Sequence, residues 1–407
     1  MHYQITAPTK LTGTIKLPAS KSISNRVLIL NALSYSDYEV ANVAECDDTQ
    51  VMLDVLDSDS NYFDIKAAGT AMRFLTAFLS KIMGEWTITG TERMKNRPIR
   101  ILVDAINQLG GKIEYLEKEG YPPLKIYGSA LQGGELELDG SVSSQYISAL
   151  LMIAPTMING LTLRLKGDVI SRSYIRMTLQ LLEEYGIQST WIGDTIRILP
   201  QEFTSKPFTV ESDWSAASYW YEMVALSENA EVELLGLNKK STQGDAMVAE
   251  LFSQLGVETT FSSKGVILTK TNQVTEKLIY NFADQPDLAQ TFVVTCCLLG
   301  IPFYFNGLQT LKIKETDRIF ALKNEMRKLG FVIADSKDSI MEWNGERCDA
   351  EKSPIIATYE DHRMAMAFAP ATFKMTNVAI AEPHVVSKSY PLYWENLIAV
   401  GFGIEER

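Results

Sequence analysis

A pattern that recurs about every 70 residues constrains this chain more than any other feature. In four places a helical run ends in Leu or Tyr followed by glycine, and a β-rich segment follows. These four glycines, which are 70 to 76 residues apart, are Gly110, Gly186, Gly256 and Gly330. Glycine suits the position just after a helix because it adopts positive φ without a Cβ clash. A weaker copy ends at Gly401, and a sixth ends near Asp57, where glycine is absent.

The length of this period indicates the architecture. Solenoid repeats are usually only about 20–50 residues long, so a period near 70 favours a larger unit of helices and strands. Such a unit, used about six times, divides evenly between two domains, which also fits a length of 407 residues. A Leu-Gly helix end is common in any α/β protein, and chance therefore remains an alternative explanation.

A polar loop, usually with a basic residue, precedes each of these helices. The five loops are 95–98, 171–174, 240–243, 314–318 and 387–391. A helix N-terminus presents unpaired N–H groups and the positive end of the dipole, which suit an anion. Lysine or arginine does not stabilise a helix there, so five such loops together indicate anion binding. For any single loop, a solvated basic residue is the simpler interpretation.

Composition limits the partners. The net charge is −12, from 50 acidic and 38 basic residues, which argues against a general nucleic-acid binder. Four cysteines make no disulfide framework, and the N-terminus shows no secretory pattern, so we expect a cytoplasmic protein. The longest apolar stretch, 291–305, is interrupted by Gly300 and Pro302 and is too short to span a membrane. Small anionic ligands remain compatible with this balance, because they need only a local basic pocket.

Several helix starts carry polar side chains that could bind an anion. In 17–26, Ser20 or Ser22 can cap a helix, but the glycines of a P-loop are missing. Thr70 and Asp361 are candidate caps of two further helices. Each motif alone is more often an ordinary cap or core packing. The three histidines lack ligand spacing and there is no C-x2-C, so we expect no metal.

Eight motifs in order along almost the whole chain resemble those of the 5-enolpyruvylshikimate-3-phosphate synthase family. They are 21–26 (KSISNR), 69–73 (GTAMR), 93–99 (RMKNRPI), 121–124 (YPPL), 143–145 (SSQ), 243–245 (QGD), 314–318 (KETDR) and 361–366 (DHRMAM). The resemblance implies an α/β (α+β) fold, a two-domain inside-out barrel with three βαβαββ repeats per domain. One domain would combine 1–19 with 213–407, the other would hold 20–212, and the active site would lie in the inter-domain cleft.

The resemblance also implies an activity. The enolpyruvyl group of phosphoenolpyruvate would move onto the 5-hydroxyl of shikimate 3-phosphate with release of phosphate, through a tetrahedral intermediate. No metal or organic cofactor is implied, and the family expectation is a monomer. Two phosphates and two carboxylates repel one another, so the enzyme needs a cation-rich site, for which guanidinium groups are well shaped.

Residue roles follow from the matched motifs. The resemblance assigns shikimate 3-phosphate binding to Lys21, Ser22, Arg26, Ser143, Ser144, Gln145, Ser171, Tyr174, Asp287 and Lys314. It assigns phosphoenolpyruvate binding to Lys21, Gly69, Arg97, Gln145, Arg318, Arg363 and Lys388. Asp287 would be the base for the 5-hydroxyl and Glu315 the proton donor to the methylene carbon, with Lys21 a further proton carrier. Further candidates for the cleft are Thr70, Arg73 and His362. The sequence alone favours a simpler interpretation of Asp287, as a loop carboxylate after proline.

The sequence departs from the family pattern at a few places. Ala67, Phe74 and Thr310 replace residues that are usually Asn, Pro and Asn, and the first repeat is short between Asp54 and Lys66. Two other functions remain as alternatives. A related transferase acts on UDP-N-acetylglucosamine, but it usually carries a cysteine in a loop whose counterpart here, 91–98, has none. A non-catalytic phosphate-ligand binder would need neither Asp287 nor Glu315.

Overall fold

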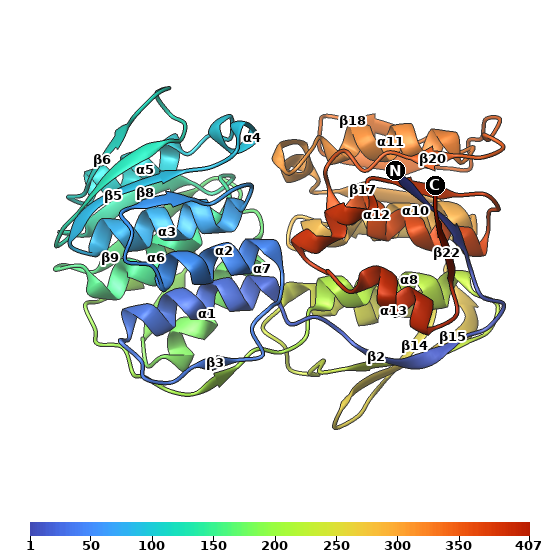
Figure 1. Cartoon of the computed structure of the whole chain (residues 1–407), viewed down its shortest axis with the longest axis horizontal. Coiled ribbons are helices and arrows are strands. Elements are labelled where there is room, and N and C mark those ends of the chain that lie inside the picture. The colour runs from blue at the N-terminus through green and yellow to red at the C-terminus, as the bar shows by residue number, and fades with distance from the viewer. The chain divides into compact units, whose positions relative to one another are not determined.

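The computed structural model describes residues 1–407, which form two compact units. The C-terminal unit consists of Met1–Pro18 and Glu211–Arg407, and the N-terminal unit of Ala19–Val210. In Figure 1 the N-terminal unit is coloured from blue to green, and the C-terminal unit runs to red, with the dark-blue N-terminal strands added to it. Each unit has its own hydrophobic core. None of the helices has both the length and the apolar character needed to cross a membrane.

The C-terminal unit contains three four-stranded sheets. The first has the order β14 (Leu255–Phe261), β15 (Gly265–Val274), β13 (Ala230–Leu235), β2 (Leu11–Lys16). The second is β16 (Leu278–Asn281), β17 (Phe303–Asn306), β19 (Ile340–Trp343), β18 (Ala334–Ser336). The third is β20 (Ile355–Ile356), β21 (Ala379–Ala381), β1 (His2–Thr6), β22 (Gly403–Glu406). Strands β1 and β2 thus complete sheets whose other strands lie more than 200 residues further along the chain.

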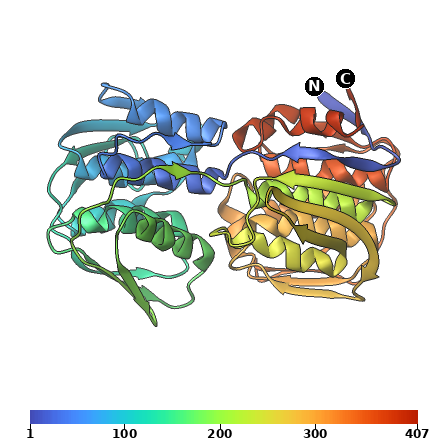
Figure 2. The same ribbon diagram turned by 90° about the horizontal axis from the view of Figure 1, so that it is seen from below.

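The helices of this unit connect those strands. They are α8 (Trp214–Leu226), α9 (Val248–Ser253), α10 (Ala289–Leu299), α11 (Arg318–Lys328), α12 (His362–Phe368) and α13 (Tyr393–Ala399). Short 3-10 turns are η2 (Gly244–Met247), η3 (Pro286–Leu288), η4 (Gln309–Ile313), η5 (Ala369–Phe373) and η6 (Pro383–Lys388). Helices α8, α10 and α12 are the most deeply buried. Figure 2 shows strands of the unit along its lower edge.

The N-terminal unit has two four-stranded sheets and one short pair. The sheets are β4 (Tyr62–Asp64), β5 (Gly84–Thr89), β7 (Leu124–Gly128), β6 (Lys112–Tyr115), and β10 (Ser189–Ile192), β11 (Thr195–Ile198), β9 (Leu161–Lys166), β8 (Gly134–Asp139). The pair is β12 (Phe208–Thr209) with β3 (Val40–Ala41). The helices are α1 (Lys21–Leu33), α2 (Asp47–Leu56), α3 (Gly69–Lys81), α4 (Glu92–Lys95), α5 (Arg100–Gln108), α6 (Ser144–Ile153), η1 (Ala154–Thr156) and α7 (Arg172–Glu184).

All five four-stranded sheets share one pairing pattern. In each, an outer strand is parallel to its neighbour, and the next two pairings are antiparallel, as in β4–β5, β5–β7 and β6–β7. Parallel strands need a crossover connection, and between β4 and β5 helix α3 supplies it. Strands β12 and β3 form the same kind of parallel pair, and α1 precedes β3 in the chain. No antiparallel strands extend this pair. The short first repeat therefore lacks two strands.

Four of the five glycines that mark the repeat lie just after a helix, as predicted, and Gly256 does not. Gly110, Gly186, Gly330 and Gly401 each follow a helix by two residues and have φ between +81° and +98°. Gly256, with φ +83°, lies at a register shift inside β14. One cap prediction was wrong: Ala68, not Thr70, is the N-cap of α3, so Thr70 lies inside the first turn. Ser20 caps α1 and Asp361 caps α12.

Candidate active site

Arg318, the first residue of α11, is the centre of a charged cluster in the C-terminal unit. Its side chain is 1% exposed and contacts three carboxylates. Nε donates to Asp361 Oδ2 at 2.7 Å, Nη1 to Asp287 Oδ1 at 3.1 Å, and Nη2 to Glu315 Oε2 at 2.9 Å. A guanidinium group has five donors in a fixed plane, so one arginine can hold all three carboxylates at once.

Asp287 in η3 joins two arginines. Its Oδ1 contacts Arg318, and its Oδ2 lies 3.2 Å from Nη2 of Arg363 in α12. The Lys314 ammonium lies 3.9 Å from the same Oδ1. Arg363 also donates from Nη1 to the Tyr219 hydroxyl at 3.3 Å. Asp287 is 13% exposed and Arg363 10%, so both are largely withdrawn from water.

Glu315 connects this cluster to a lysine from a distant part of the chain. One oxygen accepts from Arg318, and Oε1 lies 3.3 Å from Nζ of Lys388, the last residue of η6. The carboxyl group is 15% exposed and the lysine 16%. The structure therefore brings together Asp287, Lys314, Glu315, Arg318, Arg363 and Lys388, all of which the motifs predicted as site residues.

Two carboxyl groups in this cluster received no functional role from the sequence. Asp361, fully buried, accepts from Nε and Nη2 of Arg318 at 2.7 and 3.3 Å and from the Arg363 backbone N at 2.9 Å. Asp245 in η2 is also buried and hydrogen-bonds to Ser215. Both belong to quoted motifs, so a run of charged residues beside a helix start was the available signal. The predicted residue His362 is buried, with Nδ1 3.7 Å from Asp361 Oδ1.

Burial and neighbouring charges shift the pKa of several groups in this cluster. Burial lowers the pKa of the Lys314 ammonium, and the Asp287 charge offsets part of that shift. Burial raises the pKa of Asp245 to about 7, with a further increase from the neighbouring Asp287 charge. For Arg318, burial alone would lower the pKa, but the charges of Asp361, Glu315 and Asp287 raise it overall. The cluster thus holds permanent cations beside one carboxyl group, Asp245, whose protonation can change near neutral pH.

The N-terminal unit contains a second group of predicted residues, centred on Arg26. Nε donates to Thr178 Oγ1 at 2.8 Å, Nη2 to Ser148 Oγ at 3.1 Å, and Nη1 to the Ser22 carbonyl at 2.9 Å. The side chain thereby ties α1 to α6 and α7, and burial lowers its pKa to about 10. Its guanidinium carbon lies 5.2 Å from the ring centroid of Phe74. Phe74, a departure from the family pattern, therefore provides a cation–π contact for a predicted site residue.

The starts of α1 and α3 carry the next predicted residues. Lys21 Nζ lies 3.1 Å from Asp48 Oδ2, with the lysine 17% exposed. A Cβ on Gly69 would come within 2.4 Å of Nη1 of Arg97, so the Arg97 guanidinium lies directly against the first turn of α3. The glycine is needed there because any side chain would displace that guanidinium.

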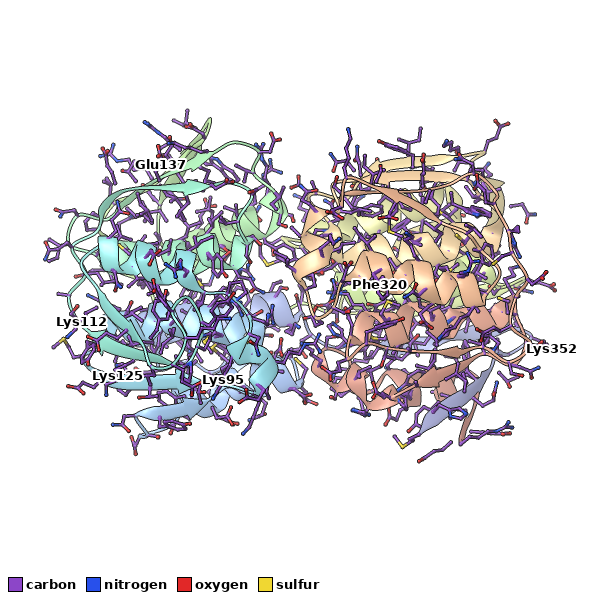
Figure 3. All side chains as sticks on the ribbon, turned by 90° about the horizontal axis from the view of Figure 1, so that it is seen from above. Lys95, Lys112, Lys125, Glu137, Phe320 and Lys352 are labelled. Carbon is purple, nitrogen blue, oxygen red and sulfur yellow. The ribbon has the colours of Figure 1, made fainter.

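Arg73 supports the loop that carries Arg97. Its Nη1 donates to the Gly69 carbonyl at 3.1 Å, and Nη2 donates to the Pro98 carbonyl at 3.2 Å. At the other end of the loop, Lys95 pairs with Glu117 at 3.0 Å, and Figure 3 labels this lysine. The Arg73 side chain is buried, and it also contacts the Met94 sulfur at 3.7 Å and lies 5.9 Å from the Tyr146 ring centroid.

The remaining predicted residues lie at the starts of α6 and α7. Ser143 caps α6, and Gln145 Nε2 donates to Thr70 Oγ1 at 3.2 Å, which connects α6 to α3. Ser144 is buried beside them. Ser171 precedes α7 with φ +55°, and the Tyr174 ring faces Arg26 at 5.7 Å. Four helices of this unit, α1, α3, α6 and α7, thus carry polar side chains near their N-termini, and direct contacts link these helices.

Comparison with known proteins shows which family this chain is similar to. The family model described as EPSP synthase (3-phosphoshikimate 1-carboxyvinyltransferase) matches residues 5–58 and 56–397. A Bacteroides fragilis protein named 3-phosphoshikimate 1-carboxyvinyltransferase is 57% identical over 406 residues, covering 100% of this chain and 99% of the relative. A protein of the same name from Photobacterium profundum is 34% identical, covering 96% of each. An EPSP synthase structure from Acinetobacter baumannii has a TM-score of 0.80 at 20% identity, covering 100% of both chains, and supports the fold.

The fold and the site define a two-unit α/β protein with six related repeats and clustered arginine–carboxylate groups. The chain belongs to the EPSP synthase (3-phosphoshikimate 1-carboxyvinyltransferase) family. The resemblance drawn from the eight motifs and the predicted fold class are confirmed.

Proposed function

We propose that this chain transfers the enolpyruvyl group of phosphoenolpyruvate to the 5-hydroxyl of shikimate 3-phosphate and releases inorganic phosphate. The observation that carries the proposal is the Arg318 cluster, which holds both predicted proton-transfer groups, Asp287 and Glu315, against permanent cations. Family membership supports the enolpyruvyl chemistry over that of a non-catalytic binder. The family match also disfavours the alternative in which a UDP-sugar is the acceptor.

The proposed chemistry is addition followed by elimination. Asp287 takes the proton of the 5-hydroxyl, whose oxygen attacks C2 of phosphoenolpyruvate, while Glu315 delivers a proton to the methylene carbon. In the second step a proton leaves the new methyl group, the double bond re-forms, and the C–O bond to phosphate breaks. Lys21 is a further proton carrier. Proton transfer by positioned carboxyl groups contributes typically 10²–10⁴-fold to a rate.

The contacts of Asp287 with two arginines bear on how this carboxylate becomes available as a base. Its Oδ1 accepts from Arg318, and its Oδ2 lies 3.2 Å from Nη2 of Arg363. A substrate phosphate or carboxylate can take those N–H donors, because bidentate guanidinium pairs form with either anion. We infer that phosphoenolpyruvate binding frees Asp287 to act as the base.

Substrate binding is proposed to involve both units. The shikimate 3-phosphate set is Lys21, Ser22, Arg26, Ser143, Ser144, Gln145, Ser171, Tyr174, Asp287 and Lys314. The phosphoenolpyruvate set is Lys21, Gly69, Arg97, Gln145, Arg318, Arg363 and Lys388, with Thr70, Arg73 and His362 as supporting residues. Domains at 1–19 with 213–407 and at 20–212, a monomeric state and a cytoplasmic location stay predictions.

Phosphate release with each acceptor tests the function. We expect release from phosphoenolpyruvate with shikimate 3-phosphate and none with UDP-N-acetylglucosamine. Glu315→Gln should lower kcat by about 10²–10⁴-fold. The control Glu395→Gln changes an exposed glutamate of α13 in the same unit and should leave kcat unchanged. Turnover with the UDP-sugar, or full turnover by Glu315→Gln, contradicts the proposal.

A further inference from the structure

Glu325, in the middle of α11, is a buried carboxylate with no part in the chemistry described above. It lies two turns beyond Arg318 on the same helix, and its side chain is 1% exposed. The opposite face of α11 is open to solvent, where Phe320 is 57% exposed (Figure 3). A buried carboxylate is costly unless its oxygens are fully bonded, so its partners indicate what it holds in place.

The hydrogen-bond partners of Glu325 lie on the segment before α12 or connect to it. Oε1 accepts from the Tyr359 hydroxyl at 2.7 Å, and Oε2 accepts from the Ala357 backbone N at 2.9 Å. Oε2 also accepts from Lys328 Nζ at 2.7 Å, and the same ammonium donates to the Ile355 carbonyl at 2.8 Å. Glu325 therefore fastens residues 355–359 along one side of α11.

The fastened segment has a backbone that needs support. Tyr359 has φ +55° and Glu360 φ +56°, two consecutive non-glycine residues in the left-handed region. A bulky side chain rarely adopts this conformation, and it persists only where the surroundings determine it. Asp361 and Arg363 follow immediately, so the direction of these two residues depends on how the two left-handed residues are held.

The same segment also contacts the residue before η6, the element that carries Lys388. Thr358, which is fully buried, donates from Oγ1 to Glu382 Oε2 at 3.4 Å. Glu382 is the residue before η6, whose last residue is Lys388. Residues 357–360 thus connect the elements that carry Arg318, Arg363 and Lys388. Two of these elements, α11 and α12, are labelled in Figure 1.

We propose that Glu325 is a positioning residue for phosphoenolpyruvate binding, acting through Tyr359 and Ala357 to fix Arg363 and Asp361 relative to Arg318. Glu325 does not touch the substrate. Its carboxylate sets the spacing of two guanidinium groups that must meet one small anion together. The inference rests on the proposed roles of Arg318 and Arg363 in binding phosphoenolpyruvate.

Two variants test the proposal through the KM of each substrate. Glu325→Gln keeps the volume and removes the charge, and Tyr359→Phe removes one hydroxyl at a partly exposed position and is expected to fold. We expect KM for phosphoenolpyruvate to rise by about tenfold in Glu325→Gln and by a smaller factor in Tyr359→Phe, as loss of a buried hydrogen bond allows. KM for shikimate 3-phosphate should stay within about twofold in both variants, since most of its proposed ligands lie in the other unit.

Two reference variants distinguish a failure of the proposed function from a failure of the positioning role of Glu325. Tyr221→Phe removes a hydroxyl bonded to Thr259 at 3.0 Å in the same unit, away from residues 355–361, and controls for a general loss of packing. Arg363→Lys reports whether the cluster binds phosphoenolpyruvate at all. If Arg363→Lys leaves that KM unchanged, the proposed function of the cluster fails. If Arg363→Lys raises it while Glu325→Gln and Tyr359→Phe match Tyr221→Phe, the positioning role of Glu325 is overturned. Should Glu325→Gln not fold, Tyr359→Phe decides alone.

Discussion

Replacement of Asp361 by asparagine tests whether the Arg318–Asp361 pair organises the C-terminal unit. Both side chains are buried, at 1% and 0% exposure, and two N–H···O contacts of 2.7 and 3.3 Å join them. Breaking a buried ion pair typically costs about 3–5 kcal/mol, because one charge is left without a partner. Arg318 keeps Asp287 and Glu315 in this variant, so its charge stays partly compensated.

The expected net cost is therefore about 2–3 kcal/mol, close to the value for one charge-assisted hydrogen bond. Asparagine is as good an N-cap as aspartate, so the bond from the Arg363 backbone N should survive the change. For a unit of about 200 residues, each kcal/mol lowers Tm by roughly 2–4 °C. We expect Tm of the transition of this unit to fall by about 4–12 °C, measured by differential scanning calorimetry.

Asp317→Asn is the matched control. Asp317 is also a helix N-cap, accepting from Phe320 N at 3.1 Å, but its ion pair with Lys312, at 3.4 Å, is partly exposed. Such surface pairs contribute about 0–1 kcal/mol. If Asp361→Asn and Asp317→Asn lower Tm equally, the buried pair has no special role and the reasoning is refuted.

Three further predictions concern other parts of the two units. Burial raises the pKa of Asp245 to about 7, so the folded state binds its proton more tightly than the unfolded state. Its contribution to stability is present below about pH 4 and is lost as pH rises through about 7. Asp245→Asn should therefore gain Tm relative to the parent between pH 5 and pH 8, and an equal Tm difference at both values would contradict this. Gly69→Ala places a methyl group against the Arg97 guanidinium, so KM for phosphoenolpyruvate should rise by about tenfold while Tm is unchanged or higher, measured by initial rates and calorimetry. Arg26→Lys keeps the charge but cannot reach Thr178, Ser148 and the Ser22 carbonyl together, so Tm of the N-terminal unit should fall by about 2–6 °C. An unchanged Tm would show that those three bonds add nothing.

Local chemistry made part of the fold readable from the sequence. Glycines that end helices need positive φ, and Gly110, Gly186 and Gly330 all have it, which is why a 70-residue period could be recognised. Charged motifs at helix starts also lie where their spacing placed them, as Asp361 and Arg318 show. The N-cap of α3 was predicted at Thr70, but the helix begins at Gly69 and its N-cap is Ala68, which makes no side-chain cap hydrogen bond.

Long-range pairing could not be deduced from the sequence in the same way. Strands β1 and β2 join sheets formed by residues more than 200 positions away, and no local pattern records that partnership. The missing hairpin of the first repeat became visible only as a two-stranded pair, β12 with β3.

The sequence by itself determined the residue types of the site: the arginines, lysines and carboxylates, each tied to a helix start by backbone N–H groups that need a cap or an anion. Only the tertiary structure decided which carboxylate meets which cation. Arg318 holds Asp287 and Asp361, and Glu325 fastens Tyr359, because residues 31 to 43 positions apart in the chain fold against one another. The contact of Arg318 with Glu315, three residues before it, is local. Charge pairing in a buried cluster depends on distances of about 3 Å, and those distances are set by the packing of α10, α11 and α12 rather than by sequence spacing.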